Sequence, residues 1–320
     1  MPTTLMIAAL LAASPPPMVP PTAMGDADVA ISEGRILFLD VGPTPWGEQL
    51  ETWVWLPPSY GQDESRRFPV LYMHDGQNLF DAALTNYNKE WQMDEAISRM
   101  AANGDLREWI VVGLRSPKER YLALFPEKLV DHMPPARVAA LAGVTNFTEV
   151  RRDMLRGDQY LVHLTQRLKP RVDELFRTLA GADDTAVMGS SMGGLMSLYA
   201  IAEYPDVFGQ AAAVSIHYPL GAPDIEDVDA NVADTTAAWE KYLATTKLDP
   251  AKNRIYMDHG TATLDQYYPP YADAFDAMMA KHGWDRSNYM SRRYTGAEHD
   301  ERAWAERVDI PLAFLDRKDP

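Results

Sequence analysis

Short apolar runs alternate with helical patterns along most of this chain, and this alternation restricts the possible folds more than any other feature of the sequence. Strands that alternate with helices are typical of a parallel sheet covered by helices on both faces. The candidate strands of this part are residues 68–76, 107–114, 184–190, 210–216, 253–260 and 287–296. The sequence therefore predicts an α/β fold built around a mostly parallel central sheet.

Two further candidate strands, residues 34–41 and 50–60, come before the alternating part and have no helical pattern between them. The second reaches Pro57 and Pro58, which have no backbone N–H to give to a neighbouring strand. We expect these two strands to form an antiparallel start to the sheet.

Helices are predicted where apolar residues recur every three or four positions. The candidates are residues 91–102, 158–180, 192–204, 269–283 and 300–308. The second of them contains Pro170, which is expected to kink it because proline cannot donate the helical hydrogen bond.

Two stretches, residues 115–157 and 217–251, are too long to be simple connections in a compact domain. We expect both to be insertions that face the substrate, the second with a helix at residues 235–246. Their aromatic residues would line a pocket or belong to the local core, and the sequence leaves both interpretations open. These residues are Tyr121, Phe125, Phe147 and Tyr218.

Length, charge and cysteine content narrow the class of protein. A chain of 320 residues can bury one large core, so residues 31–320 are expected to form a single domain. The formal net charge of −16 disfavours binding to nucleic acid or to anionic lipid, since both depend on clustered Lys and Arg. The absence of cysteine excludes disulfides and a thiolate nucleophile.

The first 30 residues are expected to be a signal peptide or a disordered tail. Residues 5–13 form an apolar run of signal-peptide length, too short for the roughly 20 residues of a membrane span. No Lys or Arg precedes the run, which weakens the signal. Export to the periplasm or the exterior is the favoured prediction, with a cleavage site of small residues at Ala23 and Gly25 before Asp26.

Residues 189–194 read GSSMGG and lie between a candidate strand and a candidate helix. A nucleophilic serine at such a junction needs small residues two positions before and two positions after it, because the backbone turns tightly there. Ser191 meets this requirement with Gly189 and Gly193, whereas Ser190 is flanked at these positions by methionines. The alternative interpretation is a glycine-rich turn with no catalytic role. Which interpretation holds depends on whether the sequence also supplies a base and a carboxylate for the serine.

A nucleophilic serine requires a histidine as base and a carboxylate that orients the histidine. We favour His299 over His217, His259 and His282, because it lies between the last strand and the last helix, where a loop can reach Ser191. For the carboxylate, Asp265 is preferred because it lies in a loop. Asp258, at the end of the preceding strand, is the alternative, and both could instead cap the following helix.

Two backbone N–H groups are expected to stabilise the oxyanion, one from Met192 and one from Gln77 in the loop after residues 68–76. Gly76 would let this loop turn sharply. Asp75 is a candidate for substrate binding, or a hydrogen-bond acceptor that fixes the loop, and His217 is a further candidate for substrate binding. Pairs such as His74 and Asp75 lack the spacing of a metal site, so neither a metal nor another cofactor is expected.

These motifs together resemble the esterase branch of the α/β-hydrolases, which includes enterochelin, feruloyl and acetylxylan esterases, S-formylglutathione hydrolases and mycolyltransferases. The resemblance runs from about residue 50 to residue 315. It is carried by VWLPPSY, FPVLYMHDGQNLFD, EWIVVGL, TAVMGSSMGGLMSLYAIAEYPDVFGQAAAVS, DHGTATLD and GAEHDERAW.

The resemblance implies an α/β-hydrolase fold and places the nucleophile at Ser191, the base at His299 and the oxyanion donors at Gln77 and Met192. It also implies an arginine near the substrate, for which Arg120 is the candidate, with a surface salt bridge as the alternative. The resulting hypothesis is a serine esterase for small-molecule or carbohydrate-linked esters. An acyltransferase with the same residues and a binding protein without turnover are the rival hypotheses.

Overall fold

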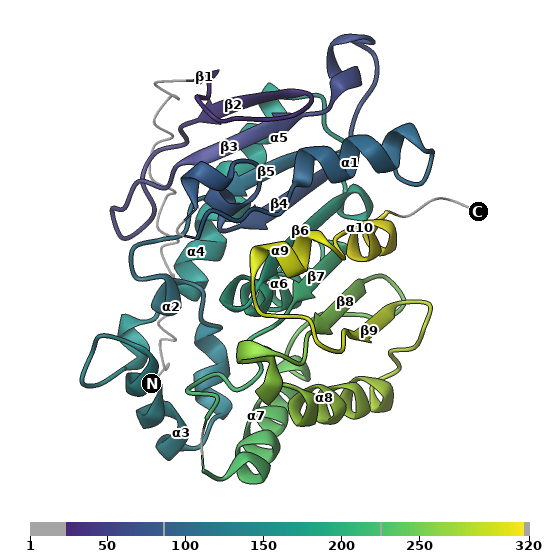
Figure 1. The fold of residues 1–320 in the computed structure, drawn as a ribbon. Coiled ribbons are helices and arrows are strands. Elements are labelled where there is room, and N and C mark those ends of the chain that lie inside the picture. The colour runs from purple at the N-terminus through teal and green to yellow at the C-terminus, as the bar shows by residue number, and fades with distance from the viewer. Residues whose placement is uncertain (1–23, 86, 225, 317–320) are drawn as a thin grey trace, which may run out of the picture.

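The computed structural model of the chain describes residues 24–85, 87–224 and 226–316. Its centre is a nine-stranded sheet in the order β1-β2-β3-β5-β4-β6-β7-β8-β9 (Figure 1). The strands are β1 (Met24–Asp26), β2 (Arg35–Leu39), β3 (Thr52–Leu56), β4 (Val70–His74), β5 (Ile110–Leu114), β6 (Thr185–Ser190), β7 (Gln210–Val214), β8 (Arg254–His259) and β9 (Tyr289–Arg293).

The sheet is antiparallel at one edge and parallel over the rest. β1 pairs with β2, β2 with β3 and β3 with β5, all antiparallel. The remaining neighbours, in the order β5-β4-β6-β7-β8-β9, all pair parallel. The predicted mostly parallel sheet with an antiparallel start is therefore confirmed. β1 was not predicted, because three exposed residues carry no alternating apolar pattern.

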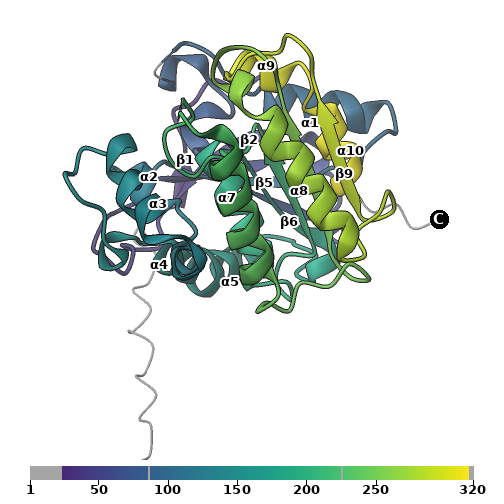
Figure 2. The same ribbon diagram turned by 90° about the horizontal axis from the view of Figure 1, so that it is seen from below.

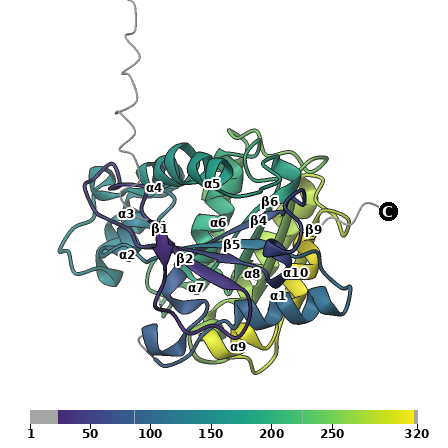
Figure 3. The ribbon, with the colours of Figure 1, turned by 90° about the horizontal axis from the view of Figure 1, so that it is seen from above.

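Helices cover both faces of the sheet (Figure 3). Alternate residues of one strand face opposite layers: Val70 and Tyr72 belong to one apolar cluster, and Leu71 and Met73 to the other. The first cluster includes residues of α4 (Gly157–His163), α5 (Lys169–Leu175), α6 (Met192–Glu203), α7 (Val228–Leu243) and α8 (Pro269–Lys281). The second includes residues of α1 (Met93–Ala102), α9 (Glu301–Ala305) and α10 (Asp309–Leu315).

The helix predicted over residues 158–180 is divided into three parts. α4 is followed by a π-helical turn, Leu164–Leu168, and then by α5, in which Pro170 occupies the first turn. The wider turn fits the missing N–H of Pro170, which cannot complete an α-helical ladder. The predicted disturbance at Pro170 is thus a local widening, and the helix ends at Leu175.

The two long stretches contain short elements and one long helix. The first holds α2 (Arg120–Ala123), the 3₁₀ segment η4 (Glu127–His132) and α3 (Pro135–Ala140). The second holds α7, which packs against η4 and lies beside α8 (Figure 2). α7 starts earlier than predicted because the carboxylate of Asp227 accepts a hydrogen bond from the N–H of Ala230 and caps the helix.

The N-terminal predictions fall largely outside the described residues. The apolar run 5–13 and Ala23 lie there, so export stays a prediction. Of the predicted tail, Met24–Asp26 pair with β2 as β1. Among the helices that the structure describes, none has the length and apolar character required to cross a membrane.

An acidic cluster at the start of α1 predicts a pH-dependent effect of one substitution. Burial and the neighbouring carboxylates of Glu95 and Asp94 raise the pKa of Glu90 to about 7. A folded-state pKa above the unfolded value of 4.5 means that ionised Glu90 destabilises the folded protein, fully above about pH 7 and not at all below about pH 4.5.

We therefore expect Glu90→Gln to have a higher free energy of unfolding than the wild type at pH 8. The gain should shrink as the pH falls to 5, where Glu90 is protonated. Urea unfolding of both proteins at the two pH values measures the difference, which includes the relief of the repulsion between Glu90 and its neighbours Asp94 and Glu95. A gain that is equal at both pH values would contradict this assignment.

Candidate active site

Ser191 occupies a strained backbone position between β6 and α6. Its φ of 57° and ψ of −120° lie outside the regions that non-glycine residues normally adopt. Its N–H donates to the carbonyl oxygen of Val214 on the neighbouring strand at 3.0 Å, and its own carbonyl accepts from the N–H of Leu195 at 3.0 Å. Strand and helix therefore hold the residue on both sides, at the carboxyl end of the parallel sheet.

The glycines two positions before and after Ser191 lie in tight surroundings, Gly189 against backbone and Gly193 against side chains. A Cβ on Gly189 would lie 2.8 Å from the carbonyl carbon of Gly193, and a Cβ on Gly193 would lie 3.1 Å from a carboxylate oxygen of Asp75. At Gly189 only glycine fits without a shift of the backbone, whereas a side chain at Gly193 would displace the Asp75 carboxylate by a few tenths of an ångström. These steric contacts explain why the sequence has glycines two positions before and two positions after Ser191.

Gly189→Ala is expected to lower the free energy of unfolding by about 1–3 kcal/mol, because a buried clash with backbone cannot be relieved by a side-chain rotation. Gly143→Ala is the matched control, since a Cβ there meets nothing within 4 Å. Urea unfolding of the two variants gives the comparison. Equal stability of the two would show that the turn is not tightly packed.

His299 and Asp265 form a hydrogen-bonded pair. His299 Nδ1 lies 2.5 Å from Asp265 Oδ1, and the Asp265 side chain is completely buried. The second oxygen, Oδ2, accepts hydrogen bonds from the Ser215 hydroxyl at 2.6 Å and from the N–H of Gly260 at 2.5 Å. Burial alone would raise the pKa of Asp265, but its contacts with His299, Ser215 and Gly260 outweigh it and lower that pKa.

The alternative carboxylate, Asp258, has other partners. Its two oxygens face the buried guanidinium of Arg307 at 3.0 and 3.1 Å. It also accepts hydrogen bonds from the N–H of Ser215 and from the hydroxyl of Tyr256. Asp258 is thus the charge partner of Arg307, whereas Asp265 is the carboxylate that contacts His299.

Ser191 and His299 line the same cavity, which has a volume of about 570 Å³ and lies at the carboxyl ends of the parallel strands. Within the described residues, no hydrogen bond joins the side chains of Ser191 and His299. In enzymes, such catalytic hydrogen bonds often tighten only when substrate binds. Lys89 forms an ion pair with Asp300 in the wall at 2.5 Å, and Tyr87 is 74% exposed at the cavity. The other lining residues are Asp75, Gln77, Asn78, Ser116, Arg120, Ser190, Thr263, Glu298, Glu301 and Trp304.

Of the two residues predicted as oxyanion donors, Gln77 lines this cavity, and Met192 directly follows Ser191. Met192 is the first residue of α6, and the N–H groups at the start of a helix have no partner within the helix. Gln77 lies in the 3₁₀ turn Gly76–Asn78 after β4, and its side-chain amide exchanges two hydrogen bonds with Ser116.

The sequence suggested that Gly76 makes the sharp turn of this loop, but a different residue makes it. The left-handed residue is Asp75, with φ 57°. Gly76 is needed for a different reason: a Cβ there would lie 2.5 Å from the carbonyl carbon of Gly113 on β5. The loop passes too close to the neighbouring strand for any side chain at this position.

Arg120 and Asp75 form a two-pronged ion pair in the cavity wall, with N–O distances of 2.7 and 2.6 Å. The side chains are 34% and 7% exposed, so the pair is not the surface salt bridge considered from the sequence. The same guanidinium reaches the carbonyl oxygen of Ser190 at 3.4 Å. Burial opposes ionisation of Asp75, but Arg120 and the Ser116 hydroxyl lower its pKa. The pair thus joins the Gln77 loop to the turn that carries Ser191.

The sequence from residue 45 to residue 313 matches the protein family described as "Putative esterase". This range contains the Ser191 turn and the His299–Asp265 pair. The chain belongs to this esterase family.

Individual known proteins are similar to this chain at low sequence identity. The uncharacterized protein YbbA of Bacillus subtilis (strain 168) is 28% identical over 208 residues, which cover 65% of this chain and 66% of YbbA, just under two thirds of its length. A ferulic acid esterase structure superposes with a TM-score of 0.61 at 17% identity, over 89% of this chain and 98% of the other.

The ferric enterobactin esterase of Salmonella typhimurium superposes with a TM-score of 0.58 at 17% identity, over 90% of this chain and 59% of that one. At these identities the likeness to solved structures establishes the fold. It confirms the α/β-hydrolase fold that the sequence predicted.

Other predicted residues lie elsewhere. His217 is buried, and its ring nitrogens contact the hydroxyl of Tyr268 at 3.1 Å and the carbonyl of Gly221 at 3.0 Å. Burial lowers the pKa of His217 to about 4, so the ring is neutral at pH 7. It is absent from the wall of the Ser191 cavity, and its proposed contact with substrate stays a prediction.

The two long stretches contribute little to the Ser191 cavity. Ser116 and Arg120 line it, but residues 217–251 do not. Phe125 and Tyr218 belong to the core, Tyr121 packs against that core, and Phe147 is exposed. None of these four aromatics lines the Ser191 cavity, and the core interpretation is confirmed for Phe125 and Tyr218.

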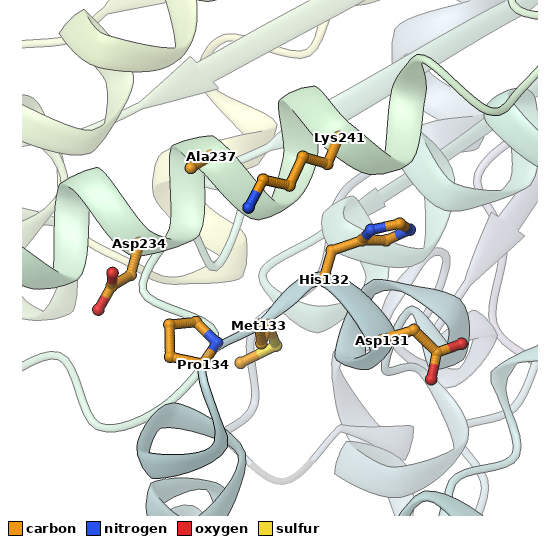
Figure 4. Close-up of a pocket in the computed structure, with 7 residues that line it drawn as sticks. All are labelled: Asp131, His132, Met133, Pro134, Asp234, Ala237 and Lys241. Carbon is orange, nitrogen blue, oxygen red and sulfur yellow. The ribbon is translucent and has the colours of Figure 1, made fainter.

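The long stretches instead enclose a second cavity of about 450 Å³ between η4 and α7 (Figure 4). His132 and Met133 line one side of it, and Asp234 and Lys241 on α7 line the other. Among the described residues, no group of three or more His, Asp or Glu side chains is arranged to hold a metal ion.

Three residues of the site region were missed from the sequence: Ser215, Trp304 and Arg307. Ser215 follows β7, and the other two lie three residues apart in the segment after His299. The only signal for Trp304 and Arg307 was their residue type within the helix predicted over residues 300–308. Their partners lie far away in sequence, which no local pattern reveals.

Proposed function

We propose that this protein is a serine carboxylic-ester hydrolase. In this proposal Ser191 attacks the ester carbonyl, His299 accepts the serine proton and returns it to the leaving alcohol, and Asp265 orients His299. Water then resolves the acyl-enzyme by the same steps in reverse. Membership of the esterase family supports ester hydrolysis as the reaction.

One observation carries the proposal. Ser191 in its strained turn and His299, which is 108 residues later in the sequence and is paired with the buried Asp265, line the same cavity. A hydroxyl becomes a good nucleophile only when a base is within reach and the base has a partner that fixes its tautomer. Strain and burial of this kind are costly, so their presence together supports catalysis.

In this proposal the backbone N–H groups of Met192 and Gln77 donate hydrogen bonds to the oxyanion that forms when Ser191 attacks. The N-terminus of α6 adds the positive end of a helix dipole to the first of them. The ion pair of Asp75 and Arg120 holds the second in place, because it fixes the loop that precedes Gln77. A donor of this kind typically contributes about 3–4 kcal/mol to stabilisation of the transition state.

The cavity size and lining support a small-molecule or carbohydrate-linked ester as substrate. A volume of about 570 Å³ falls in the range of sites for small ligands. Its wall combines hydroxyl, amide and charged side chains with the rings of Tyr87 and Trp304.

The proposal is tested with a panel of short-chain acyl, feruloyl, acetyl-sugar and catecholate esters. Released acid and alcohol are measured in the absence and presence of an added sugar or alcohol acceptor. Hydrolysis that is unchanged by the acceptor supports the hydrolase. A product in which the acyl group has moved to the acceptor favours an acyltransferase, and no turnover of any ester contradicts the proposal.

A further inference from the structure

Ser215 lies directly after β7 in a conformation that is uncommon for a residue other than glycine. Its φ is 41°, and its side chain is completely buried. Its N–H donates to Asp258 Oδ1 at 2.9 Å. Backbone strain of this kind persists only where the surroundings fix it, and it concentrates at functional sites.

The hydrogen-bonding capacity of the Ser215 hydroxyl is fully used. Its oxygen accepts hydrogen bonds from Trp304 Nε1 at 2.9 Å and from Arg307 Nη2 at 2.8 Å. Indole and guanidinium groups are donors only, so they fill the two acceptor positions of the oxygen. The hydroxyl proton is therefore directed at Asp265 Oδ2, 2.6 Å away.

Arg307 is held in this place by its own partners. Its guanidinium contacts both oxygens of Asp258, donates to the carbonyl of Ala303 at 3.2 Å and lies 4.8 Å from the ring centre of Tyr294. The ion pair is buried, with side-chain exposures of 5% and 0%. Ser215 thus connects a fixed, neutralised ion pair to the carboxylate that faces His299.

Trp304 connects the same hydroxyl to the imidazole. Its ring meets that of His299 edge to face at a centroid distance of 5.2 Å. The helix that carries Trp304 begins just after Asp300, whose carboxylate caps it by accepting from the N–H of Ala303 at 2.9 Å. Any shift of this helix would move His299 and the Ser215 contact together.

We propose that Ser215, fixed by Trp304 and Arg307, is a positioning residue that holds Asp265 against His299. This inference rests on the proposed function of the pair. The hydroxyl keeps Oδ1 directed at His299 Nδ1 and takes up part of the negative charge on Oδ2. Neither Ser215 nor Arg307 lines the cavity, so both act through Asp265 rather than on the substrate.

Two substitutions remove the hydroxyl in different ways. Ser215→Ala deletes it and keeps a Cβ, whereas Ser215→Gly deletes it with a residue that adopts positive φ freely. The glycine variant separates loss of the hydroxyl from backbone strain and serves if the alanine variant does not fold. Ser98→Ala is the matched control, because it removes a buried serine hydroxyl of α1 that has no hydrogen-bond partner in the described structure.

We expect kcat of both Ser215 variants to fall about 10-fold to 100-fold, the cost of a small misplacement of a catalytic group, with KM unchanged. The acidic limb of the pH profile of kcat/KM should move to higher pH. Without the Ser215 donor more negative charge stays on Oδ1, which favours the protonated imidazole. The Nδ1 proton resonance of His299 in the NMR spectrum should change, whereas Ser98→Ala should leave it in place.

The pH comparison depends on the groups around His299 being the same in all variants. Those that face it or share its cavity are Asp265, His217, Tyr268, Asp75, Tyr87, Lys89, Arg120, Glu298, Asp300 and Glu301. None of them is changed by the substitutions.

The outcomes separate the inference from the proposed function. Wild-type kcat and pH profile in both Ser215 variants would overturn the positioning role and leave the esterase proposal standing. A fall in kcat without a shift of the acidic limb or of the Nδ1 proton would reduce Ser215 to a structural residue and also overturn it. Full ester turnover by Ser191→Ala would overturn the proposed function, and the inference with it.

Discussion

Replacing Ser191 by alanine is expected to lower kcat for ester hydrolysis by about 10⁶-fold, the loss seen when the nucleophile of a serine hydrolase is removed. The residual rate would come from substrate binding and the oxyanion donors alone. Stability should change little, because the strained backbone at φ 57° is kept and only one hydroxyl oxygen is lost. Steady-state kinetics with a chromogenic short-chain ester, together with urea unfolding, measures both quantities.

Ser190→Ala is the control for this experiment. Ser190 precedes Ser191 and also faces the cavity, but it ends β6 in regular strand conformation. We expect this variant to keep activity within about tenfold of the wild type, because the proposed nucleophile is the serine of the strained turn. Comparable losses in the two variants would mean that the turn does not select the nucleophile.

Asp265→Asn is expected to lower kcat by about 10⁴-fold with little change in KM. An amide at this position accepts less strongly and permits the wrong tautomer of His299, as in other serine hydrolases. The rate is measured near neutral pH, well above the lowered pKa of Asp265, where the wild-type carboxylate is ionised.

Asp258→Asn provides the contrast, because Asp258 pairs with Arg307 instead of His299. Leaving that guanidinium without its buried partner is expected to cost about 3 kcal/mol of unfolding free energy. Activity at a temperature where the variant is folded should fall far less than in Asp265→Asn. Loss of catalysis in Asp258→Asn with normal activity in Asp265→Asn would exchange the two roles.

The sequence predicted the parts of this site whose determinants are local. The glycines around Ser191 indicated the tight turn because the steric requirement falls within five residues. The parallel strands β4 to β8 were recognisable because they are buried on both faces and largely apolar. Chain order left four histidines after Ser191, and the position of His299 between the last predicted strand and the last predicted helix pointed to it as the base.

The parts that were not predicted depend on contacts between distant segments. Asp75 has a left-handed backbone conformation, and its carboxylate forms an ion pair with Arg120, 45 residues later. The hydroxyl of Ser215 meets Arg307, 92 residues away. For the same reason the sequence preferred Asp265 but kept Asp258 as an alternative. Asp258 lies near the end of β8 and Asp265 lies just beyond it, and only their distant partners, Arg307 and His299, distinguish them.

Covalent labelling tests the central claim, an activated hydroxyl at Ser191, most directly. The folded wild-type protein is treated with a fluorophosphonate, digested, and the modified residue is located by mass spectrometry. The account predicts a single adduct on Ser191 that forms at least a hundredfold more slowly in His299→Ala, in line with the usual contribution of a general base. An adduct on Ser190 or another residue, or an unchanged rate in His299→Ala, would contradict it.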